Sequence, residues 1–113
     1  MTRHSKVPVV LISMSNINDR RDSLLKMTAD ALCGVRAEIE KAQRGEEALD
    51  GLQQLAFMEK KLGEINEVLQ QENWCEAPKA KSGMARLVVD TWPIRDTLGD
   101  LITEIEYAYQ RLK

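Results

Sequence analysis

Residues 84–112 read MARLVVDTWPIRDTLGDLITEIEYAYQRL, and this stretch decides the fold class. Apolar or small residues recur along it at alternating steps of three and four, the spacing of one helix face. The stripe consists of Met84, Leu87, Thr91, Ile94, Leu98, Leu101, Ile105, Ala108 and Leu112. Pro93 lacks a backbone donor and its ring clashes with the preceding turn. We therefore expect a third helix that is kinked or broken near Pro93, and the unbroken phase of the stripe favours the kink.

The same spacing predicts two earlier helices. The first covers residues 18–44 and ends at Gly45, which can adopt the left-handed conformation that stops a helix. The second starts at once, with Glu46 and Glu47 in its first turn, and carries a leucine-rich stripe from Leu49 to Leu69. So short a connection makes the two helices antiparallel. Three helices of similar length, about 40 Å each, predict an all-α fold, an elongated antiparallel three-helix bundle over residues 16–113.

Residues 1–15 are expected to form a separate, apolar N-terminal segment. Their run VPVVLISM, residues 7–14, is too short for a transmembrane helix and does not end in a signal-peptide cleavage pattern. We therefore expect a cytoplasmic protein with no membrane association. A competing interpretation makes residues 7–14 and 86–92 two buried strands of a small α/β fold, because both are rich in β-branched residues. Whether residues 7–14 form a strand, a helix extension or a disordered segment stays open.

Composition narrows the function classes. The chain has 113 residues, 43% of them hydrophobic and 30% charged, which indicates one folded domain. Sixteen basic and 18 acidic residues give a net charge of −2, the wrong sign for a surface that neutralises phosphates. Binding of nucleic acid through the basic groups near the N-terminus and in the loop at Lys79 and Lys81 is therefore only a third hypothesis.

The residues that usually carry chemistry are sparse. Cys33 and Cys75 fall about 27 Å apart along the predicted hairpin, so we expect two reduced thiols and no disulfide. His4 is the only histidine, which excludes a zinc site made from histidine and cysteine pairs. The sequence therefore assigns no catalytic residue, no cofactor and no metal ligand.

The runner-up function is that of an enzyme. The segments Glu46-Glu47-Ala48-Leu49-Asp50 and Asp96-Thr97-Leu98-Gly99-Asp100 carry paired carboxylates, and the second resembles the Leu-Gly-Asp helix of the MazG family. That resemblance implies a helical, magnesium-dependent nucleotide pyrophosphatase. The segment departs from the family pattern at Thr97, where the partner carboxylate would stand. The alternative for these carboxylates is a solvated helix face.

Two apolar features exceed what a self-contained bundle needs. The third helix carries a second strip, made of Val88, Trp92, Ile102 and Tyr109, and the N-terminal run includes Val9 and Leu11. The strip either lies inside the bundle or meets another chain, and in the second case Trp92 and Tyr109 are the natural anchors. We expect these six residues to bind a partner. The sequence thus predicts a non-enzymatic protein–protein interaction module, an adaptor, chaperone-like binder, inhibitor or regulatory subunit that forms a homodimer by coiled-coil-like contacts.

Overall fold

The computed structural model describes the backbone of residues 6–76, 82–93 and 96–112, with side chains described from residue 18 onward. Its elements are α1 (Lys6–Gln43), α2 (Leu52–Gln70), the short 3₁₀ helix η2 (Trp74–Glu76), α3 (Met84–Thr91) and α4 (Thr97–Arg111). The described residues contain no strand, which confirms the all-α class. The competing α/β interpretation is wrong, because residues 7–14 lie in α1 and residues 86–91 in α3.

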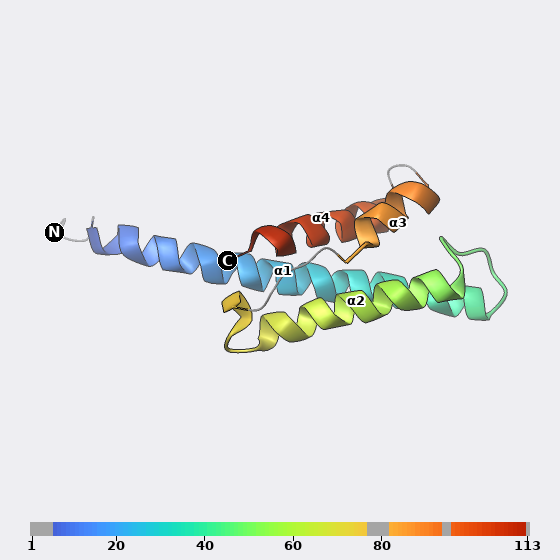
Figure 1. The fold of residues 1–113 in the computed structure, drawn as a ribbon, viewed down its shortest axis with the longest axis horizontal. Helices are drawn as coiled ribbons and strands as arrows, with labels where there is room; N and C mark the ends of the chain where they lie inside the picture. Colours follow the sequence, from blue (N-terminus) through green and yellow to red (C-terminus); the bar gives the residue numbers. More distant parts are fainter. Residues whose placement is uncertain (1–5, 77–81, 94–95, 113) are drawn as a thin grey trace.

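The helices form a rod of 64 × 25 × 22 Å, with α1 along its whole length (Figure 1). Both α2 and α4 run back along α1 in the opposite direction and contact it, whereas α3 packs against α4. An ion pair of 2.9 Å between Arg36 Nε and Glu59 Oε2 ties α1 to α2 on the surface. Helix α1 is therefore the longest element of the bundle, and the other helices lie beside only part of its length.

The C-terminal end of α1 follows the sequence prediction. Gly45 has a φ of +81°, and its N–H donates to the carbonyl of Ala42 at 3.1 Å. The N–H of Glu46 donates to the carbonyl of Lys41 at 2.9 Å. These two nested bonds form a Schellman motif, which needs a left-handed residue where Gly45 lies. Gly45 as the helix stop is confirmed.

The connection after Gly45 is longer than predicted. Glu46 and Glu47 lie in a loop, and α2 begins only at Leu52. The N–H of Leu49 donates to Oε1 of Glu38 on α1 at 2.8 Å, so a side chain rather than a helical carbonyl satisfies this donor. A contact between residues so far apart in the chain holds the loop open, and local helix propensity gives no sign of it.

The predicted third helix is two helices, so the described residues contain four α-helices and not three. The preference for a kink is wrong, because Trp92 has φ −93° and ψ 157°, an extended conformation that ends α3. A residue that precedes proline is driven out of the α region by contact with the proline ring, and Trp92 precedes Pro93. The chain then restarts as α4, where the Asp96 side chain accepts a bond from the N–H of Gly99 at 3.0 Å. As a result α3 and α4 fold back on each other.

One hydrophobic core joins all the elements. Helix α1 and the predicted leucine-rich stripe of α2 supply much of it, since Leu24, Ala31, Val35, Leu55, Met58, Leu62, Ile65 and Leu69 are buried. In α4 the core contains Ile105 of the predicted stripe together with Ile102 and Tyr109 of the second strip, while Leu98 and Leu101 of the stripe are only partly buried. The fold-back of α3 onto α4 turns this second face of α4 inward.

Candidate functional site

The four strip residues predicted to meet a partner lie inside the single chain. Val88 is 8% exposed, Trp92 5%, Ile102 0% and Tyr109 6%. They belong to the same core as the stripes of α1 and α2. The expectation that part of this strip is exposed is therefore wrong, and the internal cover, which the sequence left as the alternative, is what the structure shows. The physical reason is the fold-back of α3 onto α4, which uses the strip as its packing surface.

Asp50, in the loop before α2, fixes the junction between α3 and α4. Its Oδ2 accepts a hydrogen bond from the indole Nε1–H of Trp92 at 3.0 Å. The hydroxyl of Thr91 also lies 3.0 Å from this oxygen, and its single hydrogen can go there or to the Leu87 carbonyl at 2.8 Å. The other carboxylate oxygen of Asp50, Oδ1, accepts a hydrogen bond from the N–H of Gly51 at 2.8 Å. This carboxylate is therefore occupied in holding the fold together.

Gly99 allows the close approach of α3 to α4. A Cβ at this position would lie 2.9 Å from Val88 Cγ1 and 3.2 Å from Trp92 Cε3. Contacts this short are repulsive, so a side chain at residue 99 would push the two helices apart. The glycine of the segment that resembles the MazG family thus has a packing role here.

Glu106 is a buried carboxylate, 5% exposed, with a structural role as well. Its Oε1 accepts from the Ser82 hydroxyl at 2.5 Å and from the N–H of Ala85 at 3.1 Å. Ser82 Oγ in turn accepts from the N–H of Met84 at 3.2 Å. Two of the free N–H groups at the start of α3 are satisfied in this way, and the negative charge lies at the positive end of the helix. Glu106 therefore anchors α3 to α4.

The carboxylates of the enzyme hypothesis do not gather at one place. Among the residues that the structure describes, no three His, Cys, Asp or Glu side chains are grouped so that they could hold a metal ion. Glu46 pairs with Arg44 at 2.8 Å, and this hydrogen bond raises the pKa of Arg44. Asp50 and Asp96 make the hydrogen bonds given above, and Glu47 and Asp100 are exposed.

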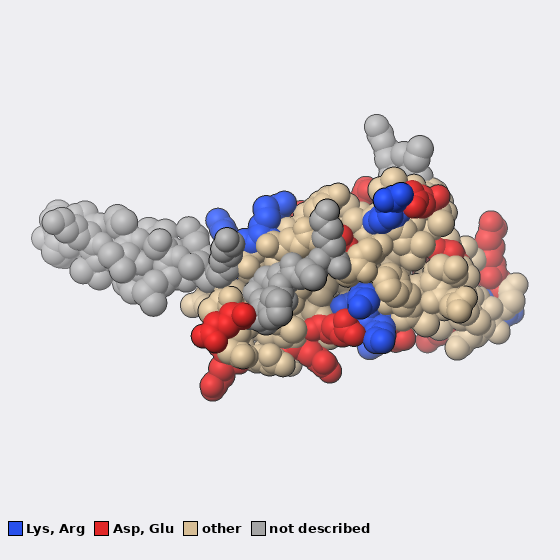
Figure 2. Space-filling view, in the orientation of Figure 1, with Lys and Arg blue, Asp and Glu red and all other residues tan. Residues whose placement is uncertain are grey.

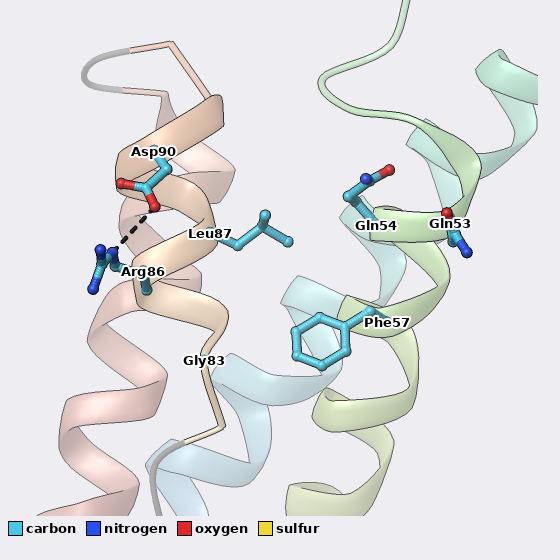
Figure 3. A pocket seen from close by; sticks show the side chains of 7 residues that line it. All are labelled: Gln53, Gln54, Phe57, Gly83, Arg86, Leu87 and Asp90. Carbon is cyan, nitrogen blue, oxygen red and sulfur yellow. Dashed lines mark hydrogen bonds and ion pairs between the residues drawn. The ribbon is translucent and has the colours of Figure 1, made fainter.

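A shallow groove of about 430 Å³ lies between the start of α2 and α3 (Figure 3). Phe57 and Leu87 point toward each other across it, with Gln53 and Gln54 along the α2 side. Arg86 and Asp90 form an ion pair of 3.1 Å on the side of α3 that points away from α2. The groove offers apolar contact and amide groups, with this ion pair at its edge.

A second hollow, of about 710 Å³, lies where α1 leaves the bundle. It is lined by Asp19, Arg20, Ser23, Leu24, Met27, Ala108, Arg111 and Leu112. Nearby, the guanidinium of Arg21 stacks over the ring of Trp74 at 5.8 Å and pairs with Asp22 at 3.1 Å. The floor of the hollow is thus the end of the core, where the buried residues Leu24 and Leu112 line it.

Helix α1 continues beyond this hollow. Figure 1 shows its first turns, residues 6–17, extending past the bundle with no other described element beside them. We call residues 6–17 the arm. Val9 and Leu11 lie in the arm, but their side chains are outside the described residues, so their role stays a prediction. The proposed boundary between residues 15 and 16 falls within α1 and also stays untested.

Cys33 and Cys75 are free thiols on the surface, as predicted. No helix in the described part of the chain is both long enough and apolar enough to cross a membrane. Comparison with protein-family models, with curated proteins and with solved structures finds no match for this chain, and the proposal that follows depends on its own geometry.

Proposed function

We propose that the chain is a non-enzymatic protein–protein interaction module and that the arm is its binding element. The observation behind this proposal is that α1 continues as a helix beyond the end of the bundle (Figure 1). Seven of the twelve residues in the arm are Val, Leu, Ile or Met. An apolar helix is normally covered by another element, and within the single chain no described element covers this one.

The energetics of a short helix support the same proposal. An isolated helix below about 12 to 15 residues is marginal in water, because the cost of starting it is recovered only slowly along its length. The arm is joined to a helix already fixed by the bundle, so it avoids that starting cost. Pro8 is the third residue of α1, where its missing N–H would have had no acceptor within the helix. The arm is therefore preformed for a partner, which lowers the entropy lost on binding.

Because the second strip is buried inside the single chain, the proposal keeps only the N-terminal part of the expected partner site, which is the arm. Chaperone-like binding, inhibition and service as an adaptor or regulatory subunit all use such a surface. What they share is recognition of another protein by an amphipathic or apolar helix, one of the common modes of protein recognition.

Capture from native lysate tests this proposal. The tagged full-length chain is compared with Val10→Asp/Met14→Asp, which places two charges in the arm. The matched control is Val89→Asp, since Val89 lies on α3 and is 75% exposed. We expect the wild type and the control to retain the same proteins and the arm variant to lose them. Equal capture by all three chains, or capture by none together with a wild type that is monomeric in solution, would remove the basis for the proposal.

A further inference from the structure

We propose that the arm's partner is a second copy of this chain, with the two arms side by side and antiparallel. This inference rests on the proposed function and names its partner. Three independent features lead to it: the register of α1, the distribution of charge, and the hollow at the base of the arm.

The apolar repeat on the buried side of α1 continues from the bundle into the arm. In the bundle, α1 buries Leu24, Thr28, Ala31 and Val35, which are exposed by 2% or less. Counted back by whole multiples of seven residues, these positions become Ile17, Met14, Val10 and Val7. Apolar residues at alternating steps of three and four, repeated every seven, are the pattern by which helices pair lengthwise. Arg21 is the one charged residue on this line between Val7 and Val35.

The helices that pack against this side of α1 end where the arm begins. Helix α2 ends at Gln70 and α4 at Arg111, and Leu112 lies beside Leu24 at the hollow. Arg21, stacked over Trp74, marks the end of the core. A face built to be buried therefore continues for about 18 Å, the length of twelve helical residues, past the last helix that could bury it. A second arm is an element with the same length and the same repeat.

The distribution of charge sets the direction of the pair. Residues 1–18 contain Arg3 and Lys6 and no Asp or Glu, which leaves 14 basic and 18 acidic residues in the rest of the chain. Two parallel arms would bring their basic starts together. In an antiparallel pair, Lys6 of each copy lies level with Asp19 of the other, because the twelve residues between these two positions span about the length of the arm.

The base of the arm also holds cations, which limits the size of this attraction. Arg20 and Arg111 line the hollow, whereas the charge of Arg21 is paired with Asp22. Exposed Glu72 and Glu76 flank the buried Trp74 at this end. Figure 2 shows both acidic and basic side chains at the left end of the described surface. The apolar face thus supplies the affinity, and the charges choose the direction, as charged positions do in paired helices.

The hollow extends the contact beyond the arms themselves. Its apolar lining comes from Leu24, Met27, Ala108 and Leu112, and it opens where α1 leaves the bundle. In an antiparallel pair the first turn of one arm reaches the base of the other, which is the position of the hollow. The interface is then continuous with the core of each copy, and the same patch serves both copies, as the two-fold symmetry of a dimer requires.

The first test is the mass of the purified full-length chain, measured by sedimentation over a wide range of concentration. We expect a monomer–dimer equilibrium in the wild type and in Val89→Asp, and a monomer in Val10→Asp/Met14→Asp. Circular dichroism confirms that the bundle of the arm variant is intact. A wild type that stays monomeric throughout would overturn this inference, while arm-dependent capture from lysate would leave the proposed function standing. A dimer that the arm variant does not weaken would overturn it too.

The second test concerns direction and uses Lys6→Glu and Asp19→Lys. In the antiparallel pair each substitution alone places like charges at both ends, so each should weaken the dimer on the order of tenfold at low salt. An equimolar mixture of the two variants restores opposite charges at both ends and should recover the wild-type dissociation constant. In a parallel pair Lys6→Glu exchanges one repulsion for another, so an unchanged dimer would overturn the antiparallel arrangement.

Discussion

Replacement of Trp92 by alanine tests whether this residue stabilises the core of the single chain or binds another chain. Trp92 is 5% exposed, and its indole N–H donates to Asp50 at 3.0 Å. Removal of a buried aromatic side chain to alanine typically costs about 3 to 5 kcal/mol, since burial is lost and a cavity is left. We therefore expect Trp92→Ala to lower the free energy of unfolding by roughly that amount. The mass of the chain in solution should stay that of the wild type wherever the variant is folded.

A milder variant isolates the hydrogen bond. Trp92→Phe keeps most of the ring but removes the N–H, and a bond to a partly buried carboxylate contributes about 1 to 2 kcal/mol. Asp50→Ala removes the acceptor, so the double variant should cost less than the sum of the two single variants by about 1 kcal/mol. Urea unfolding followed by far-ultraviolet circular dichroism gives all four values.

Two outcomes would refute this reasoning. The first is a loss below about 0.5 kcal/mol for Trp92→Ala, the range of surface substitutions, which would show that Trp92 is not in the core. The second is a Trp92→Ala chain that keeps its stability but associates more weakly, which would show that the indole lies in an interface between chains. Additive losses for Trp92→Phe and Asp50→Ala would mean that the hydrogen bond contributes nothing.

Two further predictions concern glycine packing and alkaline pH. Gly63→Ala should stabilise the fold by up to about 1 kcal/mol, since Gly63 lies in a helix interior and the new Cβ meets no atom within 4 Å. Gly99→Ala should destabilise the fold, because its Cβ would lie 2.9 Å from Val88 Cγ1. Thermal melts of both variants measure this, and a stabilised Gly99→Ala would contradict the tight contact of α3 with α4. Burial and the nearby Glu64 raise the pKa of Tyr109 in the folded chain above its ordinary value of 10.0. The unfolded chain therefore loses this proton first as the pH rises, so the contribution of Tyr109 to stability is complete below pH 10.0 and is lost as the pH rises through the pKa of the folded chain. Tyr109→Phe should flatten the alkaline fall in unfolding free energy, and an equally steep fall in the variant would contradict the assignment.

Local pattern was enough to predict the helical class and several buried faces. Leu55 to Leu69 of α2 follow the three-and-four spacing because one side of that helix packs on α1. Gly45 was predictable as a helix stop because the Schellman motif depends on one left-handed residue. These features are decided within a few residues of each other, so the sequence pattern contains them.

The fold-back at Trp92 was available in the sequence but outweighed by periodicity. The apolar stripe keeps its phase through Pro93, which favours one helix, yet the restriction on a residue before proline favours a break. The structure follows the steric rule, because a clash costs more than a stripe in phase can recover. The loop after Gly45 was not predictable in this way, since it depends on the long-range contacts of Glu38 and Asp50.

The burial of the predicted second strip has the same cause. A wide apolar surface on residues 84–112 looks surplus when they form one helix, and it is fully used when α3 packs against α4. The signal for the arm was also present: Ile17 lies one heptad before Leu24, and Met14 lies two heptads before Thr28. Reading residues 7–14 as a separate apolar run concealed this continuity with the helix that follows.

The two ends of the bundle therefore differ in how they close the core. At the end near Gly45, Asp50 draws the loop against Trp92, and Glu38 holds Leu49, so polar side chains from one chain seal the apolar interior. At the other end Leu24 and Leu112 reach the hollow, and α1 carries the same face onward. Because the arm adds no described contact to the bundle, the proposed association uses a part of the stripe that is separate from the part buried on folding. A charge placed in the arm should then alter assembly with little change in the stability of the bundle, whereas a charge at Ala31 should alter both.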